Sequence, residues 1–249
     1  MSLITTILGK LQAGSLAPLW HRFAPSITLS RKFKGLRLYF DSRDNAAALV
    51  IPARMLEQRE WPLLELPKYV DGSVWDIGAN IGYLTLVAAG LGRGVIAFEM
   101  SARASELLEK SRDANGLHFD IVPRGFAVEE KSYQAPDTSH PGNQIEFSDE
   151  GSVCTITYAE AEASYGTPAL IKMDIEGMEK GFFENPEFKK WIIEKQIVFV
   201  VEVHTGLLGC TPCWEDVPHV QLPSTHFLYC SDTIRLNRLL EQLGVELRV

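Results

Sequence analysis

The residues best suited to chemistry surround a glycine turn in the first half of the sequence. Asp76 ends a short apolar run, Gly78 and Gly82 bracket a turn that contains Asn80, and Glu99 lies 21 positions beyond Gly78. A carboxylate at about this spacing after such a turn is placed to accept hydrogen bonds from ribose hydroxyls, while a helix N-terminus follows the turn. We therefore predict a nucleoside-binding site. The alternative is that the glycines serve only a tight strand-to-helix turn.

The sequence of the turn, Gly-Ala-Asn-Ile-Gly, indicates which kind of nucleoside ligand is favoured. A dinucleotide fingerprint needs glycine where Asn80 stands and again where Tyr83 stands, because a pyrophosphate must approach the backbone there. This departure disfavours an NAD-type oxidoreductase, which stays the alternative. S-adenosylmethionine has the ribose but no phosphate, and it fits better.

Side chains of the right kind are present for each part of that molecule. Asp76 is placed to face the methionine ammonium, directly or through water, and the apolar Met100 and Phe126 suit the adenine ring. We count Ala127, beside Phe126, among the cofactor-binding candidates.

A second group of chemical residues follows two apolar runs further along the chain. Asp174 and Glu176 lie in "KMDIEG", and His204 ends "VVEVH" beside Glu202. A carboxylate or imidazole at the end of a strand can take a proton from a reacting hydroxyl, and these groups are our candidate catalysts. The same oxygens could bind a divalent ion. The structural alternatives are a helix cap at Asp174, solvated first-turn acids at Glu176 and Glu179, and an orienting role for His204.

The pattern of runs around these residues predicts an α/β fold. Strands are expected at "SVWDI", "GVIAFE", "FDIV", "ALIKMD" and "QIVFVVEV", with helices at "YLTLVAAGL", "SARASELLEKSRDAN" and "FKKWIIEK". Strands that alternate with helices imply a mostly parallel central sheet with helices on both faces. Residues 27–40 carry two β-prone runs around Lys34-Gly35, which predicts a hairpin. We divide the chain into an N-terminal helical and hairpin extension, 1–70, and a Rossmann-like domain, 71–249.

Composition narrows the classes of function. The chain has 249 residues, is 46% hydrophobic and 22% charged, and has a formal net charge of -8, which disfavours a nucleic-acid partner. Four cysteines do not make a secreted disulfide framework, so we expect a reducing, cytoplasmic location. The N-terminal apolar run is too short to span a bilayer, and no stable membrane insertion is expected.

Two turn-rich stretches, 132–151 and 205–226, are expected to be loops. The second follows "VVEVH" and could be a lid over the crevice or a plain surface loop. Its Cys210 and Cys213 could join nearby histidines in a zinc site, but one Cys-x-x-Cys pair is weak support. We expect no metal.

Four segments of the sequence resemble the FkbM-type S-adenosylmethionine-dependent methyltransferases: "VWDIGANIGYLTL", "VIAFEMSARASELLEKSRDANG", "LIKMDIEGMEKGFF" and "VVEVH". They span about Val74 to His204 in the expected order, and "IKMDIEGMEK" is the most specific. The likeness extends to "REWPLLELPKYV", where Glu60 stands at a position that is often acidic and near the cofactor. Met100 departs from the family, in which proline is common there.

The resemblance implies a Rossmann-like class I methyltransferase fold with the cofactor over Asp76 to Gly82 and Glu99, and S-adenosylhomocysteine as the product. It also implies O-methylation of a small-molecule or glycan acceptor, namely a hydroxyl of a sugar, glycan or natural product. A non-catalytic binding protein on the same fold is the other alternative. No Asn or Asp followed by Pro-Pro and an aromatic residue occurs, which disfavours methylation of a nucleic-acid base.

The basic residues of the expected hairpin, Arg31, Lys32, Lys34 and Arg37, contrast with the acidic chain. We expect them to face solvent, as lysines on edge strands do, or an anionic acceptor.

Overall fold

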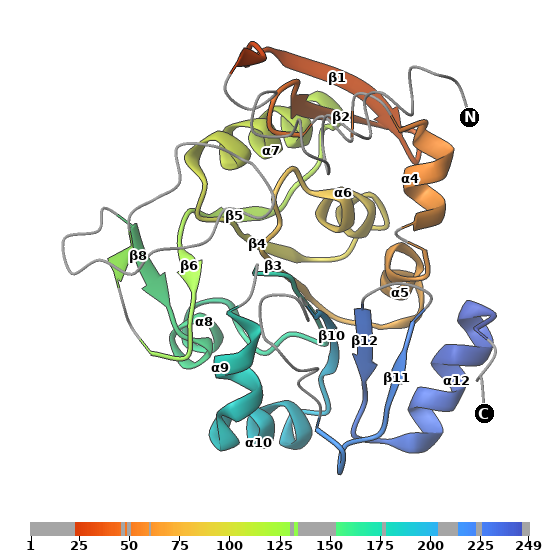
Figure 1. The fold of residues 1–249 in the computed structure, drawn as a ribbon. Coiled ribbons are helices and arrows are strands. Elements are labelled where there is room, and N and C mark those ends of the chain that lie inside the picture. Colours follow the sequence, from red (N-terminus) through yellow and green to blue (C-terminus); the bar gives the residue numbers. More distant parts are fainter. Residues whose placement is uncertain are drawn as a thin grey trace.

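The computed structural model describes residues 23–45, 48, 51–59, 61–129, 132–133, 153–175, 178–203, 214–222 and 226–245. Its centre is a seven-stranded sheet in the order β11-β12-β10-β9-β3-β4-β5 (Figure 1). The five parallel strands are β3 (Val74–Ile77), β4 (Val95–Phe98), β5 (Asp120–Val122), β9 (Leu170–Met173) and β10 (Val198–Glu202). Two further strands, β12 (His226–Tyr229) and β11 (His219–Gln221), extend the sheet: β12 pairs antiparallel with β10, and β11 pairs antiparallel with β12.

The predicted fold class is confirmed, because the sheet is mostly parallel and helices cover both of its faces. Strands β3, β4 and β9 are buried along their whole length, as expected for apolar runs between two helical layers. One face packs against α5 (Leu66–Tyr69), α6 (Tyr83–Gly90), α7 (Ala102–Asn115) and α12 (Thr233–Leu243). The other packs against α8 (Tyr158–Tyr165), α9 (Glu179–Glu184) and α10 (Pro186–Glu194).

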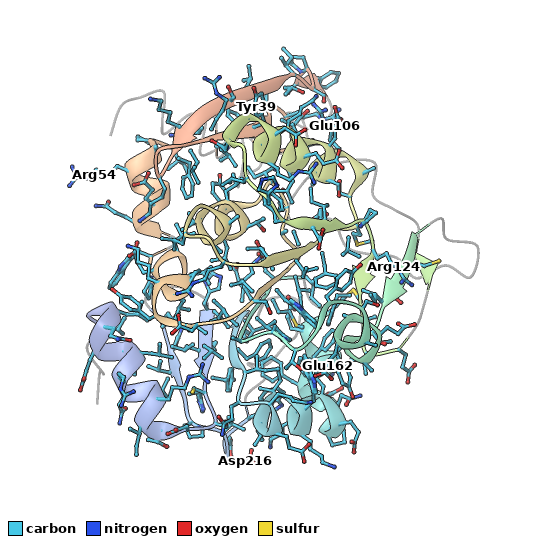
Figure 2. The ribbon with its side chains drawn as sticks, turned by 180° about the vertical axis from the view of Figure 1, so that it is seen from behind. Tyr39, Arg54, Glu106, Arg124, Glu162 and Asp216 are labelled. Atoms are coloured by element: carbon cyan, nitrogen blue, oxygen red, sulfur yellow. The ribbon has the colours of Figure 1, made fainter. Side chains whose placement is uncertain are left out.

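The predicted hairpin is present as β1 (Thr28–Phe33) and β2 (Leu36–Asp41). Lys34 and Gly35 both have positive φ, 49° and 83°, which is the backbone of the tight turn that suits two twisted strands. The hairpin lies along α7, and its Phe33, Leu38 and Phe40 join the same buried cluster as the residues of α6 and α7. Figure 2, seen from behind, shows Tyr39 of β2 and Glu106 of α7 together at this end of the molecule.

Three short elements connect the hairpin to the sheet: α4 (Ala53–Arg59), the 3-10 turn η1 (Leu63–Glu65) and α5. A small second sheet follows β5, in the order β6-β8-β7, formed by β6 (Gly125–Phe126), β7 (Ser132–Tyr133) and β8 (Val153–Ile156). The division of the chain at residues 70 and 71 stays a prediction. Among the described residues, no helix is both long and apolar enough to cross a membrane.

The interpretation of residues 205–226 as a loop was wrong for the part that is described. Trp214 and Val217 are buried, and His219–Gln221 forms the outer strand of the sheet. Pairing with β12 sets this strand, and its own sequence gives little sign of it. Residues 204–213, with Cys210 and Cys213, lie outside the described part of the chain.

Candidate active site

The site lies where the chain changes direction across the sheet. From the central strand β3 the chain proceeds to β4 and β5 on one side, and it later returns to β9 on the other side of β3. Ligands of doubly wound sheets bind at the carboxyl ends of the strands at such a switch point. Gly78 follows β3 and Asp174 follows β9, so both stand at this point.

The glycine turn after β3 needs unusual backbone angles. Gly78, Asn80 and Gly82 all have positive φ, 71°, 50° and 86°, a region in which L side chains are strained. The amides of Gly78 and Ala79 both donate to the Phe98 carbonyl, at 3.0 and 3.1 Å, which ties the turn to the end of β4. Gly82 then becomes the N-cap of α6.

Glu99 joins the two segments that were predicted to hold the nucleoside. Its carboxylate accepts from the Asn80 amide at 2.7 Å and from the Ser101 amide at 2.7 Å, one amide on each oxygen. Glu99 is 8% exposed, and burial raises the pKa of its carboxyl above the ordinary value of 4.5 although the two amides and Lys172 oppose that shift. A carboxylate has about four acceptor sites, so two remain for ligand hydroxyls.

Asp76 is buried beneath the turn. One oxygen accepts from the hydroxyl and the amide of Thr85, at 2.6 and 3.1 Å, and so fastens β3 to the first turn of α6. The other oxygen is 3.6 Å from the Lys172 ammonium. With 1% exposure, Asp76 shapes the site from below.

Lys172 is a central residue of the site that the sequence analysis did not identify. Its ammonium donates to the Gly78 carbonyl at 2.9 Å and lies 3.6 Å from Asp76 and 3.4 Å from Asp174. The side chain is 9% exposed, so these oxygens replace the water that it gives up. The only sequence signal was a lysine inside the apolar run "LIKM".

The polar residues form a row across one face of the sheet. Asp76 is in register with Lys172, and Asp174 follows two residues after Lys172, so the three side chains share a face. On the next strands Glu202 is in register with His226, whose ring nitrogen lies 3.6 Å from the Glu202 carboxylate. His226 is one of the histidines that the sequence analysis mentioned for a zinc site with Cys210 and Cys213; here it lies beside a carboxylate at the same edge of the sheet.

The predicted adenine-side residues differ in access. Phe126 is 3% exposed, and its ring packs against those of Trp75, Phe98 and Phe182. Ala127 is also buried, whereas Met100 directly after Glu99 is partly exposed.

Three predicted site residues, Glu60, Glu176 and His204, lie outside the described residues. Within the described part of the chain, no three His, Cys, Asp or Glu side chains are grouped so that they could hold a metal ion.

The basic hairpin residues are partly engaged within the chain. Lys34 pairs with Glu65 at 2.7 Å, and Arg31 donates to the carbonyls of Ala48 and Ile51. Lys32 and Arg37 are exposed.

Comparison with known proteins adds a family. The sequence profile of the methyltransferase FkbM domain matches residues 76–209, more than half of the chain. This range begins at Asp76 and includes Glu99, Lys172 and Asp174. A search of curated proteins found no match.

Solved structures that resemble the chain include methyltransferases of low sequence identity. A T. thermophilus 16S rRNA N2 G1207 methyltransferase in complex with AdoMet and guanosine has 16% identity and a TM-score of 0.44, over 83% of this chain and 51% of that one. A Pyrococcus abyssi tRNA (uracil-54, C5)-methyltransferase with S-adenosyl-L-homocysteine has 11% identity and a TM-score of 0.40, over 81% and 43%. A SAM-dependent methyltransferase from Agrobacterium tumefaciens has 16% identity and a TM-score of 0.42, over 72% and 53%. The chain thus spans about half the length of these proteins.

Proposed function

The chain belongs to the FkbM methyltransferase family, and on that premise we propose that it transfers a methyl group from S-adenosylmethionine to a hydroxyl of a sugar, glycan or natural product. The observation that carries the proposal is the position of Glu99. This carboxylate is buried at the end of β4, is fixed by two amides, and is bonded directly to the glycine turn. The cofactor would supply an electrophilic methyl group on a sulfonium.

The donor and acceptor groups of the site fit that cofactor. Glu99 would accept from the ribose hydroxyls with its two remaining acceptor sites. The turn at Gly78 would lie under the methionine end, and Met100 would contact the adenine, with Phe126 and Ala127 forming the wall behind it. Among the described residues of the site, three carboxyls, Asp76, Glu99 and Asp174, lie around the Lys172 ammonium, so the site favours a cationic ligand over a neutral one.

Asp174 is the described residue best placed to act on the acceptor. Its side chain is 26% exposed, while that of Lys172 is 9% exposed and that of Asp76 is 1% exposed. A carboxylate there would orient an acceptor hydroxyl and take its proton as the new bond forms. Lys172, 3.4 Å away, would hold the carboxylate in place. Glu176 and His204 remain our other candidates for the base.

The proposal is tested first by binding. Isothermal titration calorimetry should show that the protein binds S-adenosylhomocysteine and not NAD. Glu99→Gln should weaken this binding about ten- to a hundred-fold, because hydrogen bonds to a charged group contribute about 1.5–3 kcal/mol. The matched control is Glu109→Gln, an exposed carboxylate on α7, which should bind as the wild type does.

The acceptor is then sought with a panel of hydroxyl compounds, including sugars, glycans and phenols. The readout is acceptor-dependent formation of S-adenosylhomocysteine. Binding of S-adenosylhomocysteine that Glu99→Gln leaves unchanged would refute the role of Glu99. Transfer only to nitrogen or carbon acceptors would refute the hydroxyl.

A further inference from the structure

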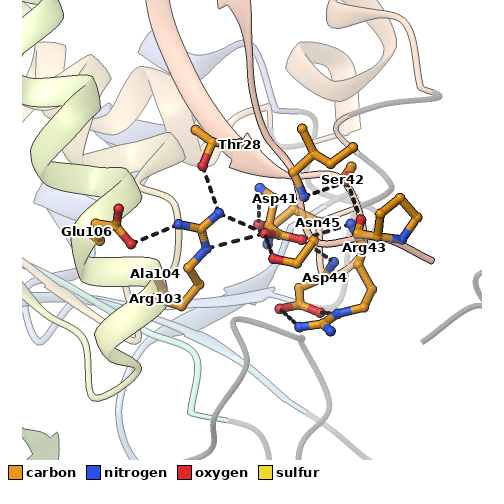
Figure 3. A network of polar contacts seen from close by, with 12 residues as sticks. Thr28, Asp41, Ser42, Arg43, Asp44, Asn45, Arg103, Ala104 and Glu106 are labelled. Carbon is orange, nitrogen blue, oxygen red and sulfur yellow. Dashed lines mark hydrogen bonds and ion pairs between the residues drawn. The ribbon is translucent and has the colours of Figure 1, made fainter. Parts of the chain in front are cut away.

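The turn that ends the N-terminal hairpin, residues 41–45, is ordered by its own hydrogen bonds. The Asp41 carboxylate accepts from the amides of Arg43 and Asp44 at 2.9 and 3.3 Å. The Asp41 amide donates to the Asn45 side-chain oxygen at 3.1 Å, and the Asn45 amide donates back to the Asp41 carbonyl at 2.9 Å. Asp41 and Asn45 are 0% and 6% exposed. Figure 3 shows both residues within this network of polar contacts. This turn lies before residue 76 and therefore outside the range that the family profile matches.

The turn reaches the glycine turn through Asn45. Because the Asn45 oxygen already accepts from Asp41, its amide nitrogen points away and donates to the Asn80 side-chain oxygen at 3.3 Å. Asn80 has a φ of 50°, which is strained for a residue with a side chain, and its own amide donates to Glu99. Asn80 is thus held from both sides, by Asn45 and by Glu99.

The same turn also reaches the segment on the other side of Glu99. Arg103, in the first turn of α7, donates to the Asp41 carboxylate at 2.9 and 3.3 Å, to Thr28 at 2.7 Å and to Glu106 at 2.8 Å (Figure 3). Two residues before Arg103, the Ser101 amide donates to Glu99. Burial opposes ionisation of Asp41, but the bonds from Ser26, Arg103 and two amides outweigh it and hold its pKa below the ordinary 3.8.

From these contacts we infer that Asn45 is a positioning residue for the cofactor. It holds the Asn80 side chain, and through it the strained turn whose amide aims Glu99 at the ribose. Asp41 sets the orientation of Asn45 and fixes it to the start of α7. The inference rests on the proposed function, because the ligand that it concerns is S-adenosylmethionine or S-adenosylhomocysteine. It assigns to the N-terminal extension a part in binding that cofactor.

The test compares Asn45→Ala, Asn80→Ala and the double variant by calorimetry with S-adenosylhomocysteine, alongside thermal unfolding. Loss of one neutral hydrogen bond should raise the dissociation constant of Asn45→Ala about three- to tenfold. The double variant should bind no more weakly than Asn80→Ala alone, since the two residues act through one bond. Asn45→Asp is the second variant, because it keeps the oxygen that accepts from Asp41 and removes the donor to Asn80.

The matched control is Asn115→Ala at the far end of the hairpin. Asn115 accepts from the Arg37 amide at 2.8 Å and donates to the Arg37 carbonyl at 2.7 Å, so its loss also loosens the hairpin from α7. This variant should unfold at a lower temperature and bind S-adenosylhomocysteine as tightly as the wild type. Thermal stability alone therefore cannot produce the expected pattern.

Any of three outcomes overturns the inference. The first is that Asn45→Ala and Asn45→Asp bind S-adenosylhomocysteine with dissociation constants within twofold of the wild type. The others are that the effects of Asn45→Ala and Asn80→Ala on binding free energy add, or that Asn115→Ala weakens binding as much as Asn45→Ala does. If the wild type binds and Glu99→Gln binds about ten- to a hundred-fold more weakly, such an outcome leaves the proposed function intact. A wild-type protein that fails to bind S-adenosylhomocysteine overturns both.

Discussion

The backbone of Asp174 lies against Gly78 so closely that no other residue fits there. A Cβ atom on Gly78 would stand 1.8 Å from the Asp174 carbonyl oxygen and 2.9 Å from its carbonyl carbon. The Asp174 amide also donates to the Ile77 carbonyl, one residue before Gly78, at 3.0 Å. The glycine that was predicted to admit a ligand therefore also brings the candidate catalytic carboxylate beside the turn.

Gly78→Ala should destabilise the protein strongly. The methyl group would meet backbone atoms that cannot turn aside, and a φ of 71° is itself unfavourable for alanine, so we expect a loss of about 2–5 kcal/mol in the free energy of unfolding. Gly92→Ala is the control: its φ is 78° and no atom lies within 4 Å of the added methyl. It should cost about 1–2 kcal/mol from the backbone alone. Equal losses in urea denaturation would contradict the close approach of Asp174.

The parallel strands could be predicted because their cause is local. Few folds other than a parallel sheet suit apolar runs that end in a glycine or an acidic residue and are separated by helical patterns. Strand β12 depends on pairing with β10, and β11 depends on pairing with β12, and the sequence of a three- or four-residue strand does not reveal such pairing.

Some residues of the candidate site could likewise be predicted from the sequence, and others could not. Asp76, Glu99 and Asp174 could be placed because each follows or ends a predicted strand, and the carboxyl ends of parallel strands share one edge. The role of Lys172 depends on the adjacency and register of β3 and β9, which bring it opposite Asp76. The bond from Asn45 to Asn80 joins residues 35 positions apart, and no spacing rule predicts it.

Binding of S-adenosylhomocysteine should weaken as the pH falls toward the ordinary glutamate pKa. Burial raises the pKa of Glu99 above 4.5, so the protonated carboxyl favours the folded state. The stabilisation that this carboxyl contributes to the fold is therefore fully present below pH 4.5 and is lost as the pH rises through the folded-state pKa. Ribose hydroxyls donate to the ionised carboxylate, so ligand binding favours ionised Glu99, whereas folding favours the protonated carboxyl. Calorimetry from pH 8 down to pH 5 should show affinity falling, and Glu99→Gln should show a flatter profile. The idea fails if both proteins share one profile.

Lys172→Met should destabilise the protein more than removal of an exposed lysine. It would leave Asp76, which is 1% exposed, without the ammonium beside it, and breaking a buried pair in this way costs about 3–5 kcal/mol. Adding Asp76→Asn should restore part of that loss, because position 76 then carries no buried charge that needs the ammonium. Lys189→Met, which breaks an exposed contact with Asp216, should cost less than about 1 kcal/mol. Urea denaturation measures the wild type, Lys172→Met, Asp76→Asn, the double variant and Lys189→Met, and simple additivity of the two buried substitutions would contradict the pairing.

Asp174→Asn should separate catalysis from binding. The substitution keeps the size of the side chain and the backbone contact with Gly78, and it removes the capacity to accept a proton. We expect the rate constant of the methyl-transfer step to fall about 10²–10⁴-fold, the usual cost of losing a general base, while the dissociation constant for S-adenosylhomocysteine changes little because Glu99 and the turn remain. Single-turnover methyl transfer to an acceptor found in the panel measures the first quantity, and calorimetry measures the second.

His204→Gln distinguishes the two candidate bases. A large loss of methyl-transfer rate in this variant, with a modest loss in Asp174→Asn, would assign the role of general base to the imidazole. Glu184→Gln, an exposed carboxylate at the end of α9, is the control for loss of a negative charge. If Asp174→Asn and His204→Gln both transfer methyl groups at the wild-type rate, neither side chain acts on the acceptor. In that case the Lys172 contact with Asp174 serves the fold alone.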